Sequence, residues 1–289
     1  MKYHLVAIFV VAVWGTTFIS TKKLLSSGLT PDDILFYRFL LAYIGIWFWG
    51  EKRLLSRSVK DEALFVLLGI TGGSLYFLTE NFALKFTHAS NVALIVCVAP
   101  LFTAILSRLF LKNERLGLNF LFGSILAFMG VALVVFNGSF MLELNPWGDF
   151  LSISAALCWA IYTILLKDVS LRYSIRFITR KVFFYGILTI LPVFCFDALN
   201  TDKTVLTRFS VWGNLLYLGL AGSLLCYFLW NMCLKKIGTI KVTNYIYAIP
   251  LVALVSSSFI LHEKITWIAL LGAGLILLGM FYAMKNSRH

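Results

Sequence analysis

The sequence predicts an all-α membrane protein with ten transmembrane helices, arranged as two inverted repeats of five helices. Three observations lead to this prediction: the apolar composition, the spacing of the apolar stretches, and a similarity between the two halves of the chain. Of the 289 residues, 60% are hydrophobic and only 13% are charged, whereas soluble proteins average about 45–50% and 25%. One globular core cannot hold this apolar excess, because the surface around a core must remain in contact with water. We therefore expect the lipid bilayer to surround the chain.

Ten apolar stretches follow one another with connections too short to form a soluble domain. Each is long enough to cross the membrane, because a helix needs roughly 20 apolar residues to span the hydrocarbon. The first stretch has no small-x-small cleavage site, so we expect a retained helix and not a removed signal peptide. The expected helices cover residues 4–22, 33–50, 63–84, 89–111, 117–137, 148–167, 178–199, 211–233, 241–261 and 266–284.

The basic charge is distributed unevenly between the two sides of this expected membrane protein. The formal net charge is +12, from 25 Lys and Arg against 13 Asp and Glu. If the N-terminus lies inside, Arg38 falls within a helix, and most of the other basic residues fall in the inner segments. By the positive-inside rule, both termini are expected in the cytoplasm and the chain in the inner (plasma) membrane. Because topology accounts for the charge, nucleic acid is not expected as a partner.

The two halves of the chain resemble each other in sequence. The run NFALKFTHASNVALIVCVAPL from Asn81 aligns with NMCLKKIGTIKVTNYIYAIPL in the second half, and VWGTTF around Trp14 aligns with CWAIYT around Trp159. These matches divide the chain into repeats at 1–137 and 147–284, each with five helices. Since five is odd, the second repeat must enter the membrane from the opposite side, as in many secondary transporters. Duplication without a transport function is the alternative.

The order and spacing of several motifs resemble those of a known family. They are WGTTF in the first helix, Arg38 in the second, ALKFTHASNVALI followed by a proline in the third and fourth, and Glu114 after the fourth. Their counterparts are Trp159, Pro250 and Glu263. With these motifs the chain resembles ten-helix transporters of the EamA branch of the drug/metabolite transporter superfamily. The resemblance implies efflux of amino acids or related metabolites through a central cavity. Sugars, nucleobases and drugs are the alternative substrates.

Pro100 and Pro250 occupy matching positions near the middle of the fourth and ninth helices. Each lacks the N–H that would bind the carbonyl four residues earlier, so both helices are expected to kink. Interrupted helices at matching positions of inverted repeats point to a binding site at the membrane midplane. We therefore expect kinks or gates here, with packing alone as the alternative.

Glu80 is expected about one turn inside the outer end of the third helix, where an ionised carboxylate is costly. Its counterpart in the second half is Trp230, so the fold itself does not require an acid at this position. Arg38 lies at a similar depth, and a Glu80–Arg38 pair lining the cavity is one hypothesis. Glu80 would otherwise carry a proton or bind a substrate's ammonium group. A static pair or a contact with Lys85 is the structural alternative.

Aromatic, amide and hydroxyl residues of the same helices complete the predicted cavity. Amides and phenols hydrogen-bond polar solutes, while aromatic rings enclose apolar parts. Anchoring at the lipid headgroups and hydrogen bonding between helices are the alternative roles for these residue types. The candidate cavity residues are Trp14, Thr17, Arg38, Tyr76, Glu80, Asn81, Asn91, Trp159, Tyr162, Tyr227, Trp230, Asn231, Asn244 and Tyr247.

Small residues are expected to bring the fifth and tenth helices close together. Gly123 and Gly130 are seven residues apart, as are Gly272 and Gly279, so each pair lies on one helix face. With Gly274, they allow close backbone approach between helices.

The sequence contains no pattern typical of a catalytic, metal or cofactor site. Four histidines lie near helix ends or termini, and five cysteines lie in apolar stretches without metal-ligand spacing. No phosphate-binding loop or ATPase module is present, so a gradient would have to drive transport of a small-molecule substrate. Protons are the candidate coupling ion and facilitated diffusion is the alternative. A membrane enzyme or a channel is disfavoured, because the sequence lacks convergent acids and repeated pore-lining charge. Since two halves already complete a transporter, a monomer is expected.

Overall fold

The computed structural model describes residues 1–49, 51, 53–86, 89–110, 118–136, 145–196, 204–261 and 266–285. Within this part of the chain the regular structure is entirely helical, with no β-strand. The first half contains α1 (Lys2–Ser26), α2 (Pro31–Trp49), α3 (Val59–Gly69), η1 (Ile70–Ser74), α4 (Leu75–Phe86), α5 (Ala89–Val96), α6 (Ala99–Phe110) and α7 (Leu118–Phe136). The second half contains α8 (Pro146–Arg172), α9 (Ile175–Ile190), α10 (Val193–Phe196), η2 (Val205–Thr207), α11 (Phe209–Leu216), η3 (Tyr217–Leu225), α12 (Cys226–Ile237), α13 (Thr239–Thr243), η4 (Asn244–Ala248), α14 (Ile249–Leu261) and α15 (Trp267–Lys285). The helical fold predicted from composition is confirmed.

Eight helices in the described residues are long and apolar enough to cross a membrane. The expected stretches at 33–50 and 178–199 are not among these eight, although their described residues are helical over 33–49, 178–190 and 193–196. α2 carries three charged residues, Asp32, Asp33 and Arg38, and α9 has only 16 residues. The eight candidate spans are Lys2–Ser26, Val59–Leu84, Val92–Phe110, Leu118–Val135, Pro146–Arg172, Phe209–Ile237, Thr239–Ser256 and Trp267–Met284.

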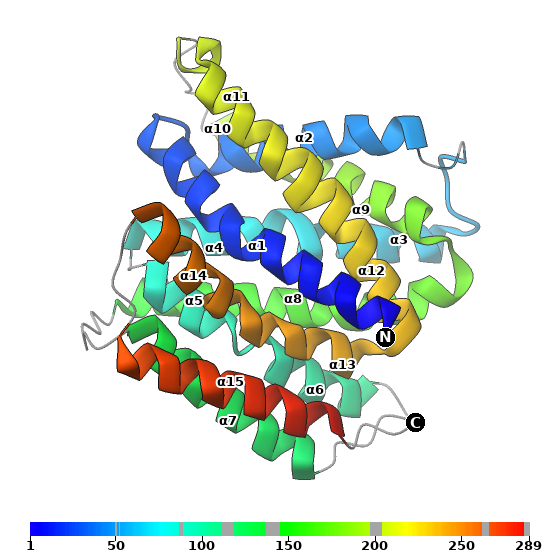
Figure 1. Cartoon of the computed structure of the whole chain (residues 1–289). Helices are drawn as coiled ribbons and strands as arrows, with labels where there is room; N and C mark the ends of the chain where they lie inside the picture. The colour runs from blue at the N-terminus through cyan, green and yellow to red at the C-terminus, as the bar shows by residue number, and fades with distance from the viewer. Residues whose placement is uncertain are drawn as a thin grey trace.

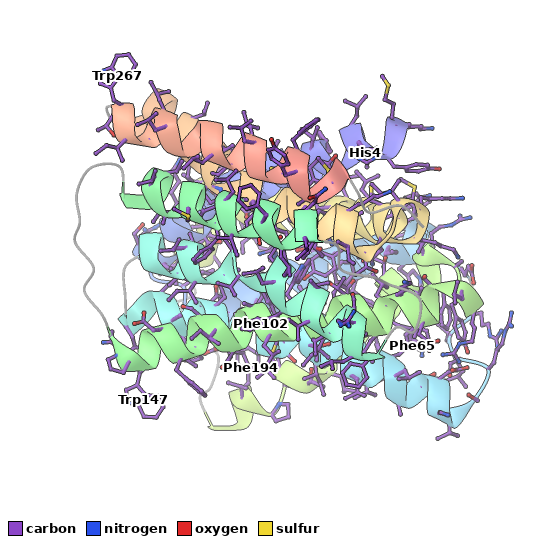
Figure 2. The ribbon with its side chains drawn as sticks, turned by 90° about the horizontal axis from the view of Figure 1, so that it is seen from below. His4, Phe65, Phe102, Trp147, Phe194 and Trp267 are labelled. Carbon is purple, nitrogen blue, oxygen red and sulfur yellow. The ribbon has the colours of Figure 1, made fainter. Side chains whose placement is uncertain are left out.

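The helices form an elongated bundle in which α1 crosses the middle and α7 and α15 lie side by side at one edge (Figure 1). The start of α1 and the end of α15 lie at the same end of the bundle. Figure 2 shows His4 near this end, while Trp147 and Trp267, at the starts of α8 and α15, project at the opposite end. Both tryptophans are largely exposed, at 70% and 83%, as is typical of side chains that meet lipid headgroups.

Local sequence signals explain where several helices begin and end. The side chain of Ser58 accepts a hydrogen bond from the backbone N–H of Asp61 at the start of α3. Asn145 caps α8 in the same way, and Pro146 occupies the first turn, where its missing N–H is harmless. Gly238 ends α12 with φ of +89°, a conformation that side chains other than glycine disfavour.

Four long helices are interrupted near their middles. α5 and α6 are separated by a turn at Cys97 and Val98, and the 3₁₀ segment η4 precedes α14. Pro100 and Pro250 are each the second residue of the helix that follows, so both helices break directly before a proline. The other two interruptions are the π-helical segments η1, between α3 and α4, and η3, between α11 and α12. The π-helical segments were not predicted from the sequence.

Glycines allow α7 and α15 to approach closely. A Cβ built at Gly279 would lie 2.4 Å from the backbone nitrogen of Ala127, and one at Gly130 would lie 2.6 Å from the carbonyl oxygen of Gly272. The expectation that Gly274 also allows close approach between helices is wrong, because a Cβ at this position would meet nothing within 4 Å. Gly274 therefore lies on another face of α15.

Candidate functional site

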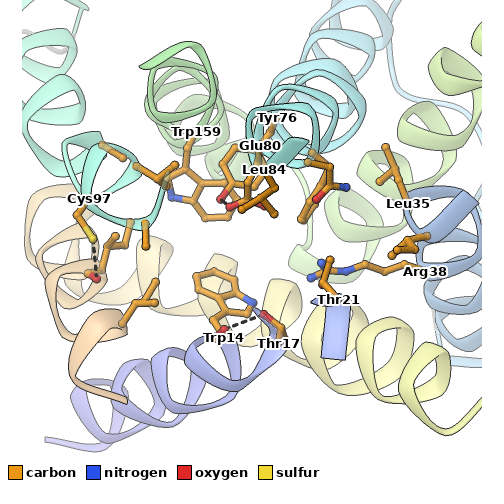
Figure 3. A pocket seen from close by; sticks show the side chains of 18 of the residues that line it. Trp14, Thr17, Thr21, Leu35, Arg38, Tyr76, Glu80, Leu84, Cys97 and Trp159 are labelled. Carbon is orange, nitrogen blue, oxygen red and sulfur yellow. Dashed lines mark hydrogen bonds between the residues drawn. The ribbon is translucent and has the colours of Figure 1, made fainter. Parts of the chain in front are cut away.

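A central cavity lies where the interrupted helices meet α1, α2 and α8. It has a volume of about 80 Å³, enough for several water molecules at roughly 10–15 Å³ each. Ala93, Val96, Cys97 and Ala99 line it around the break before Pro100, while Ile246 and Ile249 line it next to Pro250. Eight of the predicted candidates also line it: Trp14, Thr17, Arg38, Tyr76, Glu80, Asn81, Trp159 and Tyr227 (Figure 3).

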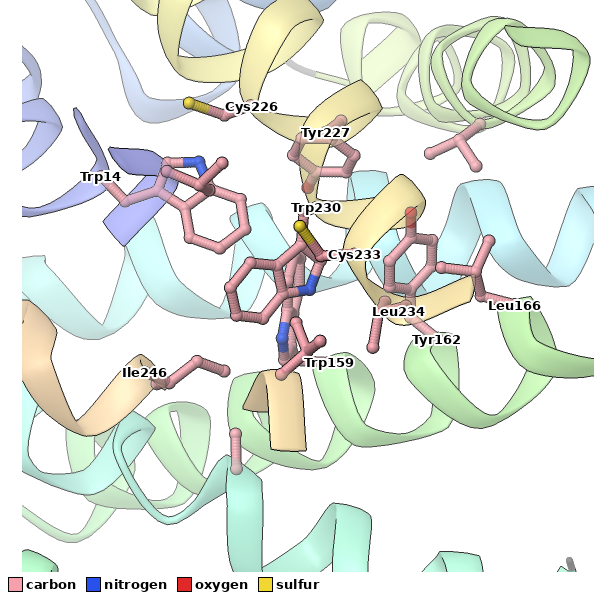
Figure 4. Packing of buried hydrophobic residues seen from close by; sticks show 14 of the residues in the cluster. Trp14, Trp159, Tyr162, Leu166, Cys226, Tyr227, Trp230, Cys233, Leu234 and Ile246 are labelled. Atoms are coloured by element: carbon pink, nitrogen blue, oxygen red, sulfur yellow. The ribbon is translucent and has the colours of Figure 1, made fainter. Parts of the chain in front are cut away.

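Aromatic rings from both halves of the chain form one wall of this cavity. The ring of Trp14 packs edge-on against that of Trp159, with centroids 5.4 Å apart. The ring centroids of Tyr76 and Tyr227 lie 5.3 Å and 5.8 Å from that of Trp159. Trp230 packs against Trp14, with ring centroids 4.9 Å apart (Figure 4), but it does not line the cavity. We call Trp14, Trp159 and Tyr227 the aromatic wall.

The two π-helical segments hold part of this wall in place. The Tyr227 hydroxyl donates to the carbonyl of Gly72 in η1 at 2.6 Å, and the Trp14 indole donates to the carbonyl of Gly222 in η3 at 2.9 Å. A π turn shifts the helical hydrogen-bond pattern and is frequent at functional sites. Gly72 is required here, since its Cβ would lie 2.2 Å from the Tyr162 ring.

Glu80 lies in α4 with only 8% of its surface exposed. One carboxylate oxygen, Oε1, accepts a hydrogen bond from the Tyr76 hydroxyl at 2.9 Å, one helical turn earlier. The alternative contact with Lys85 involves a side chain that lies outside the described part of the structure.

Arg38 reaches the same cavity from α2 and is 6% exposed. Its Nε donates to the Ser223 hydroxyl at 2.5 Å, and Nη2 lies 3.5 Å from the Gly222 carbonyl, so the guanidinium is held by η3. The guanidinium carbon lies 4.4 Å from the centre of the Phe77 ring, within the range of a cation–π contact.

Arg38 and Glu80 do not form the direct ion pair considered above. No salt bridge within 4.0 Å joins them in the described part of the chain. The reason is geometric, because Ser223 holds the guanidinium of Arg38 while Tyr76 holds the carboxylate of Glu80. Both side chains nevertheless line the same cavity.

The remaining candidates whose side chains the structure describes do not line this cavity. The Tyr162 hydroxyl donates to Asn231 at 2.7 Å, and Asn231 lies 3.2 Å from the Thr179 hydroxyl, so these amide and phenol groups join helices. Asn244 and Tyr247 are fully buried in η4. The side chain of Asn91, like all of Glu114 and Glu263, lies outside the described residues.

A network of charged and phenolic side chains, which the sequence analysis missed, joins α3 to α8 and α9. Asp61 accepts from the Tyr173 hydroxyl at 2.8 Å and pairs with Arg172. Glu62 binds both Lys181 and Tyr185. We call these six residues the end network: Asp61 and Glu62 lie at the start of α3, Arg172 and Tyr173 at the α8–α9 junction, and Lys181 and Tyr185 further along α9. The adjacent acids after the helix-capping Ser58, among many basic residues, are the sequence signal that could have revealed it.

Known proteins resemble this chain over its whole length. The model of the EamA-like transporter family matches residues 1–136 and again residues 146–284. An uncharacterized transporter of Archaeoglobus fulgidus is 29% identical over 100% of this chain and 99% of its own length. A probable amino-acid metabolite efflux pump of Escherichia coli is 26% identical over 99% of this chain and 96% of its own.

A crystal structure aligns with a TM-score of 0.80 over 99% of this chain and 98% of the other, at 19% identity. At this identity the similarity shows the fold alone. The family match covers both halves, and the relatives are named as transporters. Together with the eight apolar helices, these findings identify a multi-pass membrane protein of the transporter class. The chain belongs to the EamA-like transporter family.

Proposed function

We propose that this protein is a gradient-driven carrier that exports amino acids or related small metabolites by alternating access. The observation that carries the proposal is the central cavity, which combines a carboxylate, a guanidinium and an aromatic wall between interrupted helices. Ligand sites of this kind are mostly apolar, with a few polar groups that orient the solute. Relatives from Escherichia coli and Salmonella typhimurium named as probable amino-acid metabolite efflux pumps support the substrate class.

The proposed architecture has ten spans in two inverted repeats, 1–137 and 147–284. It requires that α2 and α9, the latter with α10, cross the membrane in addition to the eight apolar helices. The charges of α2 do not oppose this, because Arg38 faces the protein interior and is hydrogen-bonded there. Matched interruptions support the two repeats: η1 and η3 are one pair, and the breaks before Pro100 and Pro250 are the other.

In the proposed mechanism, the end network closes the cytoplasmic end of the pathway. Its side of the bundle is rich in basic residues, which the positive-inside rule assigns to the cytoplasm together with both termini. The pairs Asp61–Arg172 and Glu62–Lys181 connect the first half of the chain to the second. Opening this end for substrate entry requires that both pairs separate, while the broken helices bend beside their prolines. One chain supplies every part, so the monomer is the proposed unit, and protons are the proposed coupling ion.

Efflux from preloaded cells tests this function. Cells that produce the protein are loaded with a panel of radiolabelled amino acids, and loss of label is compared with that from control cells. We expect faster loss of specific members and loss of this effect in Glu80→Gln. Thr79→Val is the matched control, because Thr79 is the neighbouring buried residue, bonds to its own helix and does not line the cavity. If no member leaves faster than from control cells, amino-acid export is refuted.

A further inference from the structure

Arg38 and Glu80 are opposite charges in one cavity, and within the described part of the chain each is hydrogen-bonded to neutral groups alone. Arg38 contacts a hydroxyl, a carbonyl and an aromatic ring, and Glu80 contacts a phenol. Burying a charge without a charged partner is expensive, since hydrogen bonds to neutral groups replace only part of its hydration. A direct pair between the two would lower this cost, and the structure does not contain it.

Each of the two side chains also keeps one atom available for a ligand. In the described residues, Oε2 of Glu80 accepts no hydrogen bond and Nη1 of Arg38 donates none. Neither atom is a buried polar atom without a hydrogen-bond partner, so both are accessible from the cavity. Figure 3 shows both side chains reaching the same cavity, Glu80 from α4 and Arg38 from α2. A positive group would bind at one point and a negative group at the other.

We propose that the cavity recognises zwitterions, with Glu80 binding the ammonium group and Arg38 the carboxylate of an α-amino acid. Only a ligand that carries both charges neutralises both side chains at once. The aromatic wall lies beside the two charges and receives an apolar side chain, with Trp14 and Trp159 packed edge to face. Because the wall offers ring surface, apolar and aromatic amino acids are preferred over acidic or basic ones. This inference rests on the proposed export of amino acids and specifies how they are bound.

Charge-deleted analogues test the inference. Two sets are used: leucine, 3-methylbutylamine and 4-methylpentanoate, and phenylalanine, phenethylamine and 3-phenylpropionate. In each set the amine lacks the carboxylate and the acid lacks the ammonium group, while the side chain is unchanged. Binding to the purified protein in detergent is measured by the ligand-induced rise in melting temperature. A charge-assisted hydrogen bond contributes about 1.5–3 kcal/mol, so each analogue should bind about tenfold to a hundredfold more weakly than its amino acid.

Two variants assign the charges to their residues. In Arg38→Gln the amine should bind about as well as the amino acid, because the carboxylate no longer has a partner. In Glu80→Gln the acid should bind about as well as the amino acid. Thr79→Val should retain the wild-type preference. Melting temperatures without ligand show whether each variant is folded, and a variant that does not fold is replaced by Arg38→Lys or Glu80→Asp, which should keep the preference with weaker binding.

The outcomes separate this inference from the proposed function. If amino acids are exported but amine, acid and amino acid bind equally well, the zwitterion site is refuted and export stands. The zwitterion site is also refuted, and export stands, if Arg38→Gln and Glu80→Gln each lose affinity for the amine, the acid and the amino acid to the same extent. If no amino acid is exported and none binds, both are refuted.

Discussion

Replacement of Gly279 by alanine should destabilise the protein, because a single methyl group cannot fit between α7 and α15. The new Cβ would lie 2.4 Å from the nitrogen of Ala127 and 2.5 Å from the carbonyl oxygen of Gly123. Both are backbone atoms, so no side chain can rotate away, and the helices must separate by about 1 Å to restore contact distances. Inserting a group into a packed interface costs about 1–3 kcal/mol. For a protein of this size that lowers the melting temperature by about 2–10 °C.

Gly274→Ala is the matched control in the same helix. Its Cβ would meet nothing within 4 Å, and alanine favours the helix over glycine by up to about 1 kcal/mol. We expect this variant to melt at the wild-type temperature or slightly above. Gly123→Ala should reproduce the effect of Gly279→Ala, since its Cβ would lie 2.4 Å from the nitrogen of Ala283 on the facing helix.

The assay is thermal unfolding of the purified variants in one detergent, followed by size-exclusion chromatography of heated samples. Membrane proteins often unfold irreversibly, so the variants are compared at one heating rate. The interface argument is refuted if Gly279→Ala and Gly274→Ala melt at the same temperature. It is also refuted if Gly274→Ala is the less stable of the two.

Three further changes test the site and its supports. Gly72→Ala places a Cβ 2.2 Å from the Tyr162 ring, and should reduce efflux several-fold in the preloaded-cell assay; unchanged efflux would show that η1 tolerates the displacement. Trp14→Phe removes the indole N–H donated to η3 and should lower stability by about 0.5–1.5 kcal/mol; no change in melting temperature would contradict this. Glu62→Gln leaves Lys181, whose side chain is 5% exposed, without its carboxylate and should cost about 3–5 kcal/mol. Adding Lys181→Met should recover part of this loss, and a double variant less stable than Glu62→Gln would refute the pairing.

Composition and periodicity predict most of this fold, because the membrane requires long apolar helices. The limits of that reasoning appear in α2 and α9. Asp32, Asp33 and Arg38 give α2 three charged residues, and α9 ends after 16 residues. The buried faces of these helices depend on neighbours far away in the sequence. Arg38, for example, is held by Ser223, a contact that no local pattern reveals.

The candidate site shows the same division between local and long-range information. Tyr76 and Glu80, both predicted cavity residues, are four positions apart and so share a face of α4, where the structure joins them by a hydrogen bond. Spacing did not distinguish Trp159, which lines the cavity, from Tyr162, which packs against Gly72. The two residues are three apart in α8 and have similar chemistry. The contact of the Tyr162 ring with Gly72 of η1, a long-range contact, separates the two residues in the structure.

The two halves of the chain both match the family model, but they differ in their chemistry. Both halves contribute to the aromatic wall, with Trp14 from the first and Trp159 and Tyr227 from the second. Both charges come from the first half, and Trp230 occupies the position that matches Glu80. If the halves exchange shapes during transport, the charged groups move with the first half, while η3 of the second half holds Arg38 through Ser223 and Gly222. Movement of η3 relative to α2 therefore changes the hydrogen bonds of the guanidinium. In the proposed mechanism, release of the substrate carboxylate would then be coupled to the rearrangement of the two halves through Arg38, and not through Glu80, whose partner Tyr76 lies in its own helix.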